Sequence, residues 1–150
     1  MPLLLLVIVW AVSRLIAPDQ PVETTLRRTI AQQYTMTLPS TTLSVGALSL
    51  NATKFVIPDG AFDVRVDGHF SASGGSGNDI EAAVFDDNSF TAWQDRHAAV
   101  PIYSSGRTTE GSIKTPLPAG PGTYWIVFNN KFSLLSAKTV EANVTLYYSK

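Results

Sequence analysis

The chain has 150 residues and a formal net charge of −1 at pH 7, which suits one domain with short appendages and offers no basic surface for nucleic acid. The absence of cysteine excludes disulfides, thiolate metal ligands and a cysteine nucleophile, and leaves the redox compartment open. Only 15% of residues are charged, and Ser, Thr, Asn and Gly are frequent, which favours a location outside the cytoplasm.

Residues 1–17 predict a membrane anchor. Leu3–Val12 is an unbroken apolar run that continues past Arg14 to Ala17, where a proline ends any helix. A bilayer span usually needs about 20 apolar residues, so this short one crosses if Arg14 snorkels to the interface beside Trp10. A cleaved signal peptide is the alternative. No basic segment precedes the run, however, and its end does not fit a small-x-small cleavage site. We therefore expect a retained, single-pass anchor.

The sequence gives conflicting indications of which side of the membrane holds the domain. Arg14, Arg27 and Arg28 all follow the apolar run, and the positive-inside rule then places the domain in the cytoplasm. The surface composition favours export. We favour a periplasmic or extracytoplasmic domain and leave the side open.

Residues 18–41 predict a linker that contains three prolines. A stretch ending at Tyr34 can form a short helix with Leu26, Ile30 and Tyr34 on one face, although about three turns are marginal alone. An extended tether is the alternative. Because these apolar side chains avoid bulk water by packing on something, we expect them, together with Trp10, to contact partner subunits.

The remainder, residues 42–150, has the pattern of an all-β domain. Short apolar runs or period-two alternation predict strands at 43–49, 54–57, 62–72, 79–85, 112–117, 123–128 and 138–148. The segment 86–103 is predicted to be a long loop without regular secondary structure. Turns rich in Gly and Pro separate the strands, and no internal repeat is present. The sequence therefore predicts an antiparallel β-sandwich of about seven to eight strands.

The last two strands organise this domain. Thr123–Phe128 is apolar at nearly every position, as in a strand covered on both faces, whereas the final strand alternates apolar and polar residues. We expect the core to contain one face of each long strand: Phe62, Val64, Val66, Phe70, Val84, Ile126, Phe128, Val140, Val144 and Leu146.

Several motifs suggest metal binding but have a simpler explanation. The GGSGND segment Gly74–Asp79 departs from the calcium-binding glycine repeat at Glu81, and a single copy is better explained as a β-turn. Asp86 and the two residues after it could ligate a hard cation, yet Asp and Asn clusters are ordinary turn chemistry. His69 and His97 lack a third ligand for zinc. We expect no metal and no cofactor.

No motif marks a catalytic centre. A Ser-His-Asp triad has no nucleophile elbow or comparable sequence to identify its serine. The aromatic residues Trp93, Trp125, Tyr103 and Tyr124 could form a platform for a sugar, but this alternation is more typical of core and sheet-face aromatics. We therefore expect a protein that is not an enzyme.

The segment between the last two strands carries a recognisable motif, in which the asparagines can satisfy backbone groups at a corner and Lys138 can tie the returning strand to nearby carbonyls or carboxylates. Its residues are Phe128, Asn129, Asn130, Phe132, Ser133, Ser136, Lys138, Thr139 and Val140. This motif resembles the end of the GOLD (Golgi dynamics) domain, and residues 43–150 are similar to bacterial GOLD-like proteins. The resemblance implies a β-sandwich that acts through protein contacts and carries no catalytic residues.

These observations lead to one functional hypothesis and one alternative. We expect a non-catalytic, membrane-anchored protein-interaction module that serves as an accessory or stabilising subunit of a larger membrane complex, of respiratory or photosynthetic type for example. Its partners would be other membrane-protein subunits and, through residues 1–17, the lipid bilayer. The alternative is an exported carbohydrate- or ligand-binding β-sandwich.

Overall fold

A computed structural model describes residues 31–38 and 42–150. The chain divides into two compact units, Met1–Gln32 and Gln33–Lys150, and every strand and helix discussed below lies in the second. The predicted anchor, with Trp10, and the linker residues Leu26 and Ile30 lie outside the described residues. Within the described ranges, no helix is both long and apolar enough to cross a bilayer.

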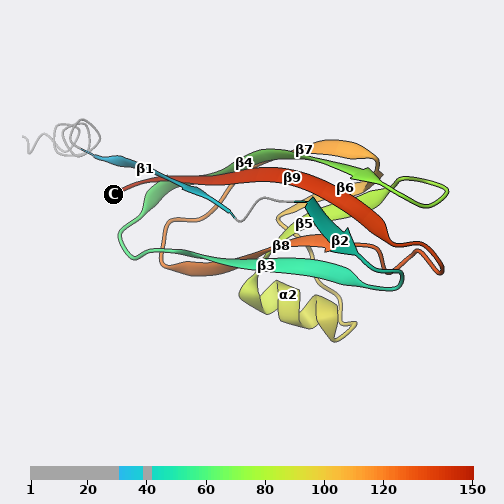
Figure 1. Ribbon diagram of the computed structural model, residues 1–150. Coiled ribbons are helices and arrows are strands. Elements are labelled where there is room, and N and C mark those ends of the chain that lie inside the picture. The colour runs from blue at the N-terminus through green and yellow to red at the C-terminus, as the bar shows by residue number, and fades with distance from the viewer. Residues whose placement is uncertain (1–30, 39–41) are drawn as a thin grey trace, which may run out of the picture. The chain divides into compact units, whose positions relative to one another are not determined.

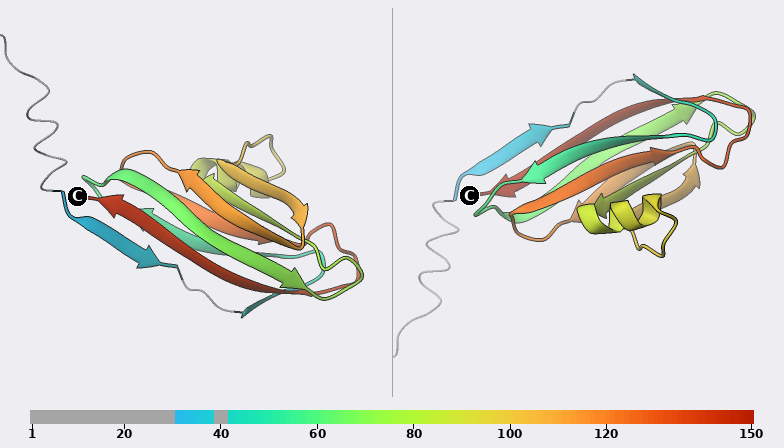
Figure 2. Two further views of the ribbon diagram at one scale, coloured as in Figure 1. Left: turned by 90° about the horizontal axis from the view of Figure 1, so that it is seen from above. Right: turned by 90° about the horizontal axis from the view of Figure 1, so that it is seen from below.

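The Gln33–Lys150 unit is a sandwich of two antiparallel sheets (Figures 1 and 2). One sheet has the order β1-β9-β4-β7, and β2 also pairs with β9; the other has the order β3-β8-β5-β6. The strands are β1 (Gln33–Thr37), β2 (Thr42–Val45), β3 (Leu50–Ile57), β4 (Phe62–Ser73), β5 (Ile80–Asp86), β6 (Tyr103–Thr108), β7 (Glu110–Pro116), β8 (Gly122–Asn129) and β9 (Lys138–Ser149). The predicted all-β sandwich is confirmed, with nine strands in the residues that the structure describes where the sequence indicated about seven to eight.

The predicted linker ends earlier than expected, because its last part is strand β1. Tyr34 does not lie on a helix: it pairs with Tyr148 of β9, and the two rings stack with centroids 5.2 Å apart. Leu38 then donates its backbone N–H to Val144 O and buries its side chain in the core. Pairing with the edge of β9 supplies the hydrogen bonds that a short isolated helix would have made within itself.

The segment expected to be irregular contains helix α2 (Asp87–Gln94). Asp86 caps it by accepting a hydrogen bond from Ser89 N (2.9 Å), and Phe90 is its buried residue. The helix packs on β5 and β8 (Figure 1), on the face of that sheet that points away from the sandwich core. This explains why β8 is apolar on both faces: Val127 lies beneath α2 and is fully buried.

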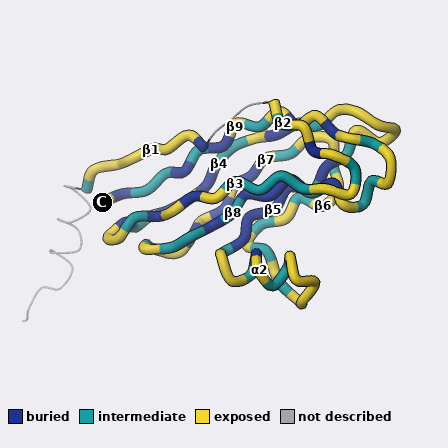
Figure 3. Tube along the Cα trace, turned by 60° about the horizontal axis from the view of Figure 1, so that its bottom comes forward, coloured by how far each residue is buried: buried dark blue, intermediate teal, exposed yellow. Residues whose placement is uncertain are grey.

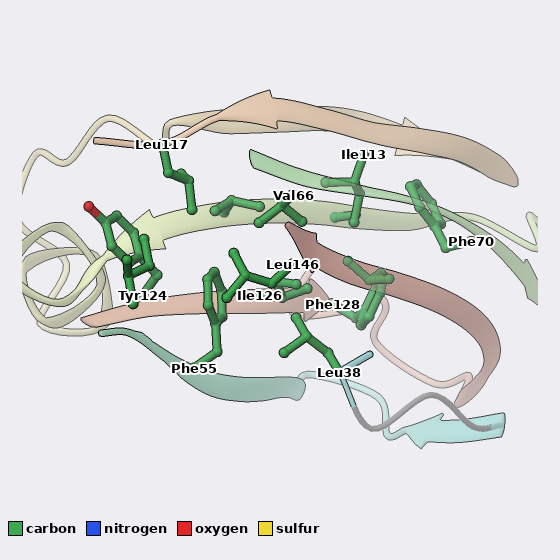
Figure 4. Packing of buried hydrophobic residues seen from close by; sticks show 14 of the residues in the cluster. Leu38, Phe55, Val66, Phe70, Ile113, Leu117, Tyr124, Ile126, Phe128 and Leu146 are labelled. Atoms are coloured by element: carbon green, nitrogen blue, oxygen red, sulfur yellow. The ribbon is translucent and has the colours of Figure 1, made fainter. Parts of the chain in front are cut away.

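The core lies between the two sheets, and its larger side chains interdigitate from both (Figure 4). The edge-to-face contact of Phe70 in β4 with Phe128 in β8, with centroids 5.7 Å apart, joins the layers. Every predicted core residue belongs to this cluster except Phe62, which is half-buried. A register shift between Phe62 and Arg65, with Asp63 at φ 50°, interrupts the alternation there.

Close approach of β4 and β9 requires one glycine. A Cβ on Gly68 would lie 2.3 Å from the backbone oxygen of Asn143 and 2.7 Å from the Cα of Val144.

The exposed surface lies on β1, on the loops and on α2, whereas β5 and β8 are the most deeply buried strands (Figure 3). The predicted alternation of β9 is confirmed, since Val140, Val144 and Leu146 are buried.

Candidate functional site

The motif segment forms a tight corner, residues 130–137, at the end of the sandwich farthest from the C-terminus (Figures 1 and 2). Asn130 is its centre and is fully buried. Its Nδ2 donates to the backbone oxygens of Ser136 (2.9 Å), Gly46 (3.0 Å) and Val45 (3.3 Å). Its backbone N–H donates to Ser49 O at 2.9 Å. One amide therefore ties the corner to the β2–β3 turn.

Neighbouring polar side chains complete the corner. Asn129 donates from Nδ2 to Glu81 Oε2 (2.9 Å) and accepts from the backbone N–H of Lys131 (3.1 Å). The Ser133 hydroxyl donates to Ser136 O (3.0 Å) and accepts from Ser136 N (3.3 Å). The hydrogen bonding expected of these residues is thus present: Ser133 holds backbone groups, and Asn129 holds one backbone group and one carboxylate. The Oδ1 atom of Asn130, in contrast, is buried without a hydrogen-bond partner.

Lys138 joins the corner to the glycine-rich β4–β5 turn. Its ammonium donates to Gly74 O (3.0 Å) and to Asp79 Oδ1 (3.1 Å), and its side chain is 3% exposed against 29% for Asp79. The hydrogen bond from Lys138 holds the pKa of the Asp79 carboxyl below its ordinary value, because it favours the charged form. Both ionic groups therefore serve the structure.

The remaining motif residues have different surroundings. Phe132 is half-buried beneath Arg107, whose Cζ lies 3.9 Å from the ring centroid. Thr139 is exposed on β9 between Ser44 and Ser73 on the flanking strands. Phe128 packs in the core, as described above. The motif thus combines a core anchor with a hydrogen-bonded corner.

The acidic cluster after β5 is engaged in local structure. Asp86 accepts from both the backbone and the hydroxyl of Ser89, and the backbone hydrogen bond in particular holds the pKa of Asp86 below its ordinary value. Asp87 accepts a 2.7 Å hydrogen bond from Trp125 Nε1. In the GGSGND turn, Gly74 and Gly75 have positive φ, and Asn78 accepts from Gly74 N. Across residues 31–38 and 42–150, no group of three or more Asp, Glu or His could hold a metal ion.

The two histidines are exposed and lie apart, and His69 stands opposite Ser112 of β7 in the sheet. His69 lies exposed on β4, and His97 lies exposed after α2, where its backbone N–H donates to Ala92 O. The two histidines form no shared site. His69 is on β4 of one sheet, whereas His97 follows α2, which packs on β5 and β8 of the other sheet (Figure 1).

The candidate aromatic platform is divided between packing clusters. Trp93 and Trp125 pack with Phe85 and Phe90, and the stacked rings of Phe90 and Trp125 have centroids 4.5 Å apart. Ammonium groups cover the two indoles: Lys131 lies 4.8 Å from Trp93, and Lys54 lies 5.5 Å from Trp125.

The two tyrosines are separated from these indoles. Tyr124 stacks on Phe55 in the core, and Tyr103 donates to Ser112 O. Burial raises the pKa of both phenols, because it disfavours their charged form. The four aromatic residues therefore do not make one open platform.

Sequence reasoning missed a group of exposed leucines at the corner and the neighbouring β2–β3 turn. Leu48, Leu134 and Leu135, here called the leucine tip, are 58%, 73% and 94% exposed. The backbone N–H of Leu48 donates to Ser133 O (2.9 Å), which brings the β2–β3 turn beside the corner. The available indication was the Ser-Leu-Leu-Ser sequence in a polar corner, where paired leucines have no strand or helix in which to bury themselves.

Comparisons with known proteins assign no family. No family model matches the chain, and no curated protein matches it. Among solved structures it is similar to the crystal structure of dimeric latent PorU from Porphyromonas gingivalis, at 10% sequence identity and a TM-score of 0.47. The match covers 80% of this chain and 13% of that chain, so this chain spans a small part of that protein's length.

Proposed function

We propose that the protein is a non-catalytic, membrane-anchored interaction module of GOLD-like type, an accessory or stabilising subunit of a larger membrane complex. Residues 1–17 would hold it in the bilayer, with the Gln33–Lys150 sandwich on the extracytoplasmic side. Leu26 and Ile30, between the two, would contact neighbouring subunits.

The observation that carries this proposal is the contrast between polar side chains that hold local structure and large apolar side chains that are exposed to solvent. The side chains best suited to chemistry hold structure instead: Asp79 with Lys138, Asp86 at the helix cap, and Asn130 at the corner. Large apolar side chains meanwhile remain exposed on several elements: Met36, Leu48, Val56, Val100, Ile102, Leu134 and Leu135. Exposed apolar side chains that gather on one part of a folded domain mark contact with protein or membrane, and Leu48 lies beside the corner that carries Leu134 and Leu135, because its backbone N–H donates to Ser133 O.

Near-zero net charge indicates how such contacts would form. A chain with a net charge of −1 has little long-range electrostatic steering. Association would then depend on buried apolar area and change little between low and high salt. The GOLD resemblance of the corner supports the same class of function, because that family acts through protein contacts.

Co-purification from native membranes tests the proposal. The full chain carries a C-terminal affinity tag and is extracted in mild detergent from the organism that encodes it. We expect a stoichiometric set of membrane subunits with the wild type and with a surface control, Lys114→Ser, at an exposed position on β7. The double variant Leu26→Ser/Ile30→Ser should lose these subunits while keeping a folded sandwich. Recovery of the tagged chain alone would contradict the proposal.

Tyr34 needs a separate variant. Because it stacks on Tyr148 within the sandwich, its substitution loosens β1 as well as any partner contact. Tyr34→Phe keeps the stacked ring and removes the hydroxyl, so it reports on the contact with less effect on the strand.

A further inference from the structure

Within the described residues, the two sheets have four edges, formed by β1 with β2, by β7, by β3 and by β6. Three of these edges are irregular. Strands β1 and β2 pair with β9 in registers that differ by one residue. Strand β6 has a register shift and Gly106 at φ 63°. On β7, Pro116 lacks a backbone donor, and the Tyr103 hydroxyl donates to Ser112 O at 2.9 Å. Such features keep a sheet edge from pairing with other chains.

Strand β3 is the regular edge in the described part of the chain. Its eight residues pair with β8 in a single register, from Leu50 opposite Asn129 to Ile57 opposite Gly122. It contains no proline and no glycine. A long, regular edge strand is a template for pairing with another extended chain. Strand β3 therefore differs from the other three edges in the property that controls pairing.

The backbone of β3 offers hydrogen bonds to a further strand. Just before β3, the backbone N–H of Asn130 donates to Ser49 O at 2.9 Å, which makes these two residues a hydrogen-bonded pair. In an antiparallel ladder such pairs alternate with pairs whose N–H and C=O groups point away from the partner strand. Because the register continues unchanged along β3, the backbone groups of Ala52, Lys54 and Val56 point away from β8, toward the free edge.

Apolar side chains lie on both faces beside this edge. Phe55 and Ile57 are buried in the core, so Val56 between them points to the outer face, where it is 54% exposed. Met36 of β1 is opposite the buried Leu146 and thus on the core side of its sheet, yet it is 39% exposed. Strand β2, at the same edge as β1, contacts β3. A strand added to β3 would extend its sheet on the side of β1 and can cover both side chains.

The chemistry of the edge determines what can bind there. A row of backbone donors and acceptors is matched by an extended chain, whereas a helix uses its own backbone groups internally. A second copy of β3 fits poorly. Antiparallel self-pairing with the core faces aligned would place the two Lys54 side chains directly or diagonally opposite each other on the outer face, and like charges there are destabilising. The edge therefore favours an extended segment of a different protein.

We propose that the free edge of β3 binds an extended segment of a partner protein by strand addition. The segment has apolar residues at alternate positions, which cover Met36, and an acidic residue near Lys54. Main-chain hydrogen bonds supply affinity in this mode of recognition, and the alternate side chains supply specificity. The inference rests on the proposed interaction function for the existence of a partner, but it does not depend on the anchor.

A proline substitution at one edge position tests this in the full chain. A short acetylated peptide of alternating valine and threonine, with one central glutamate and a fluorophore, is titrated against the protein in mild detergent. Lys54→Pro removes one N–H from the free edge, whereas the matched control Lys54→Thr loses the same ammonium and keeps that N–H. We expect saturable binding to the wild type and to Lys54→Thr. Binding to Lys54→Pro should be at least about tenfold weaker, because a hydrogen bond is lost and the ring obstructs the edge.

Two controls keep the result interpretable. Protection of the β8 amides from hydrogen exchange shows whether each variant is folded. The same peptide, N-methylated at every backbone amide, keeps its side chains and loses its donors, so it should not bind the wild type. This second control carries the test if Lys54→Pro does not fold.

The outcomes separate this site from the proposed function. Equal binding to both variants, or binding of the methylated peptide, overturns strand addition. Absence of saturable binding to the wild type overturns the edge site, while co-purification from native membranes decides the interaction function separately. A dimer of the purified chain that Lys54→Pro abolishes would assign the edge to a second copy and overturn the partner proposed.

Discussion

The ion pair between Lys138 and Asp79 should respond unequally to removal of its two halves. The lysine side chain is 3% exposed and the aspartate 29%. Asp79→Asn leaves a buried ammonium without its counter-ion, whereas Lys138→Met leaves a carboxylate that water can reach. Charges in low-dielectric surroundings are costly when unpaired, so Asp79→Asn is the more damaging change.

The magnitudes follow from this burial. We expect Asp79→Asn to lower the free energy of unfolding by about 3 kcal/mol, at the low end for a broken buried pair because Asp79 is partly solvated. Lys138→Met should cost about 1 kcal/mol, chiefly the hydrogen bonds to Asp79 and Gly74 O. With a urea m-value of about 1.5 kcal/mol/M, these losses shift the unfolding midpoint by about 2 M and about 0.7 M.

Urea unfolding, monitored by tryptophan fluorescence, measures both midpoint shifts. The measurement uses a fragment of residues 31–150, which contains the whole sandwich core. The double variant Asp79→Asn/Lys138→Met should resemble Lys138→Met, since it leaves no unpaired charge. If Lys138→Met is as damaging as Asp79→Asn, or the double variant is worse than either, burial of the ammonium is not what makes this pair matter.

Three further predictions concern the same domain. Phe128→Ala should lower the free energy of unfolding by about 3–5 kcal/mol, since Phe128 is 4% exposed; a melting temperature within a degree or two of wild type would contradict it. Acid titration should show a loss of stability as pH falls below 3.8, the ordinary Asp value, through the lowered folded-state pKa of Asp79 and Asp86; Asp86→Asn should flatten this dependence, and an unchanged profile would exclude the helix cap as a contributor. Tyr34→Ser should speed amide exchange in β1 and leave β4 and β8 protected; uniform exchange would mean that β1 is integral to the core.

The sequence predicted those parts of the fold whose pattern reflects burial. Alternation in β9 and the apolar run of β8 each specify which faces are covered. At the corner, the hydrogen-bonding roles of Asn130 and Lys138 could be predicted, because side chains of these types near a turn commonly bond to backbone groups. The sequence correctly predicted that these side chains form hydrogen bonds, but it did not identify which atoms accept them.

The parts that were missed depend on tertiary partners. Strand β1 is exposed along its whole length and forms because the edge of β9 is available to it. Strand β6 contains Gly106 at φ 63° and few apolar residues, so no alternation marks it. Helix α2 is only eight residues long, and the cap by Asp86 with Ser89 was its one local indication.

The surface residues were the hardest to predict. Leu48 lies near Leu134 and Leu135 because two loops, about 85 residues apart in the chain, are hydrogen-bonded through Asn130 and through the backbone N–H of Leu48. No local pattern relates them. A pair of leucines in a loop could equally have closed over the core, and only the folded geometry shows that it did not.

The size of the particle that holds the native protein tests the central claim most directly. Endogenous chain is extracted from its own membranes in a mild detergent and separated by native electrophoresis, with detection by an antibody against the sandwich. The chain has a mass of 16.2 kDa. We predict that it migrates in a discrete particle several times larger and shared with other membrane subunits. Migration as a single chain in a detergent micelle, or recovery from the soluble fraction after carbonate washing, would contradict its role as an anchored accessory subunit.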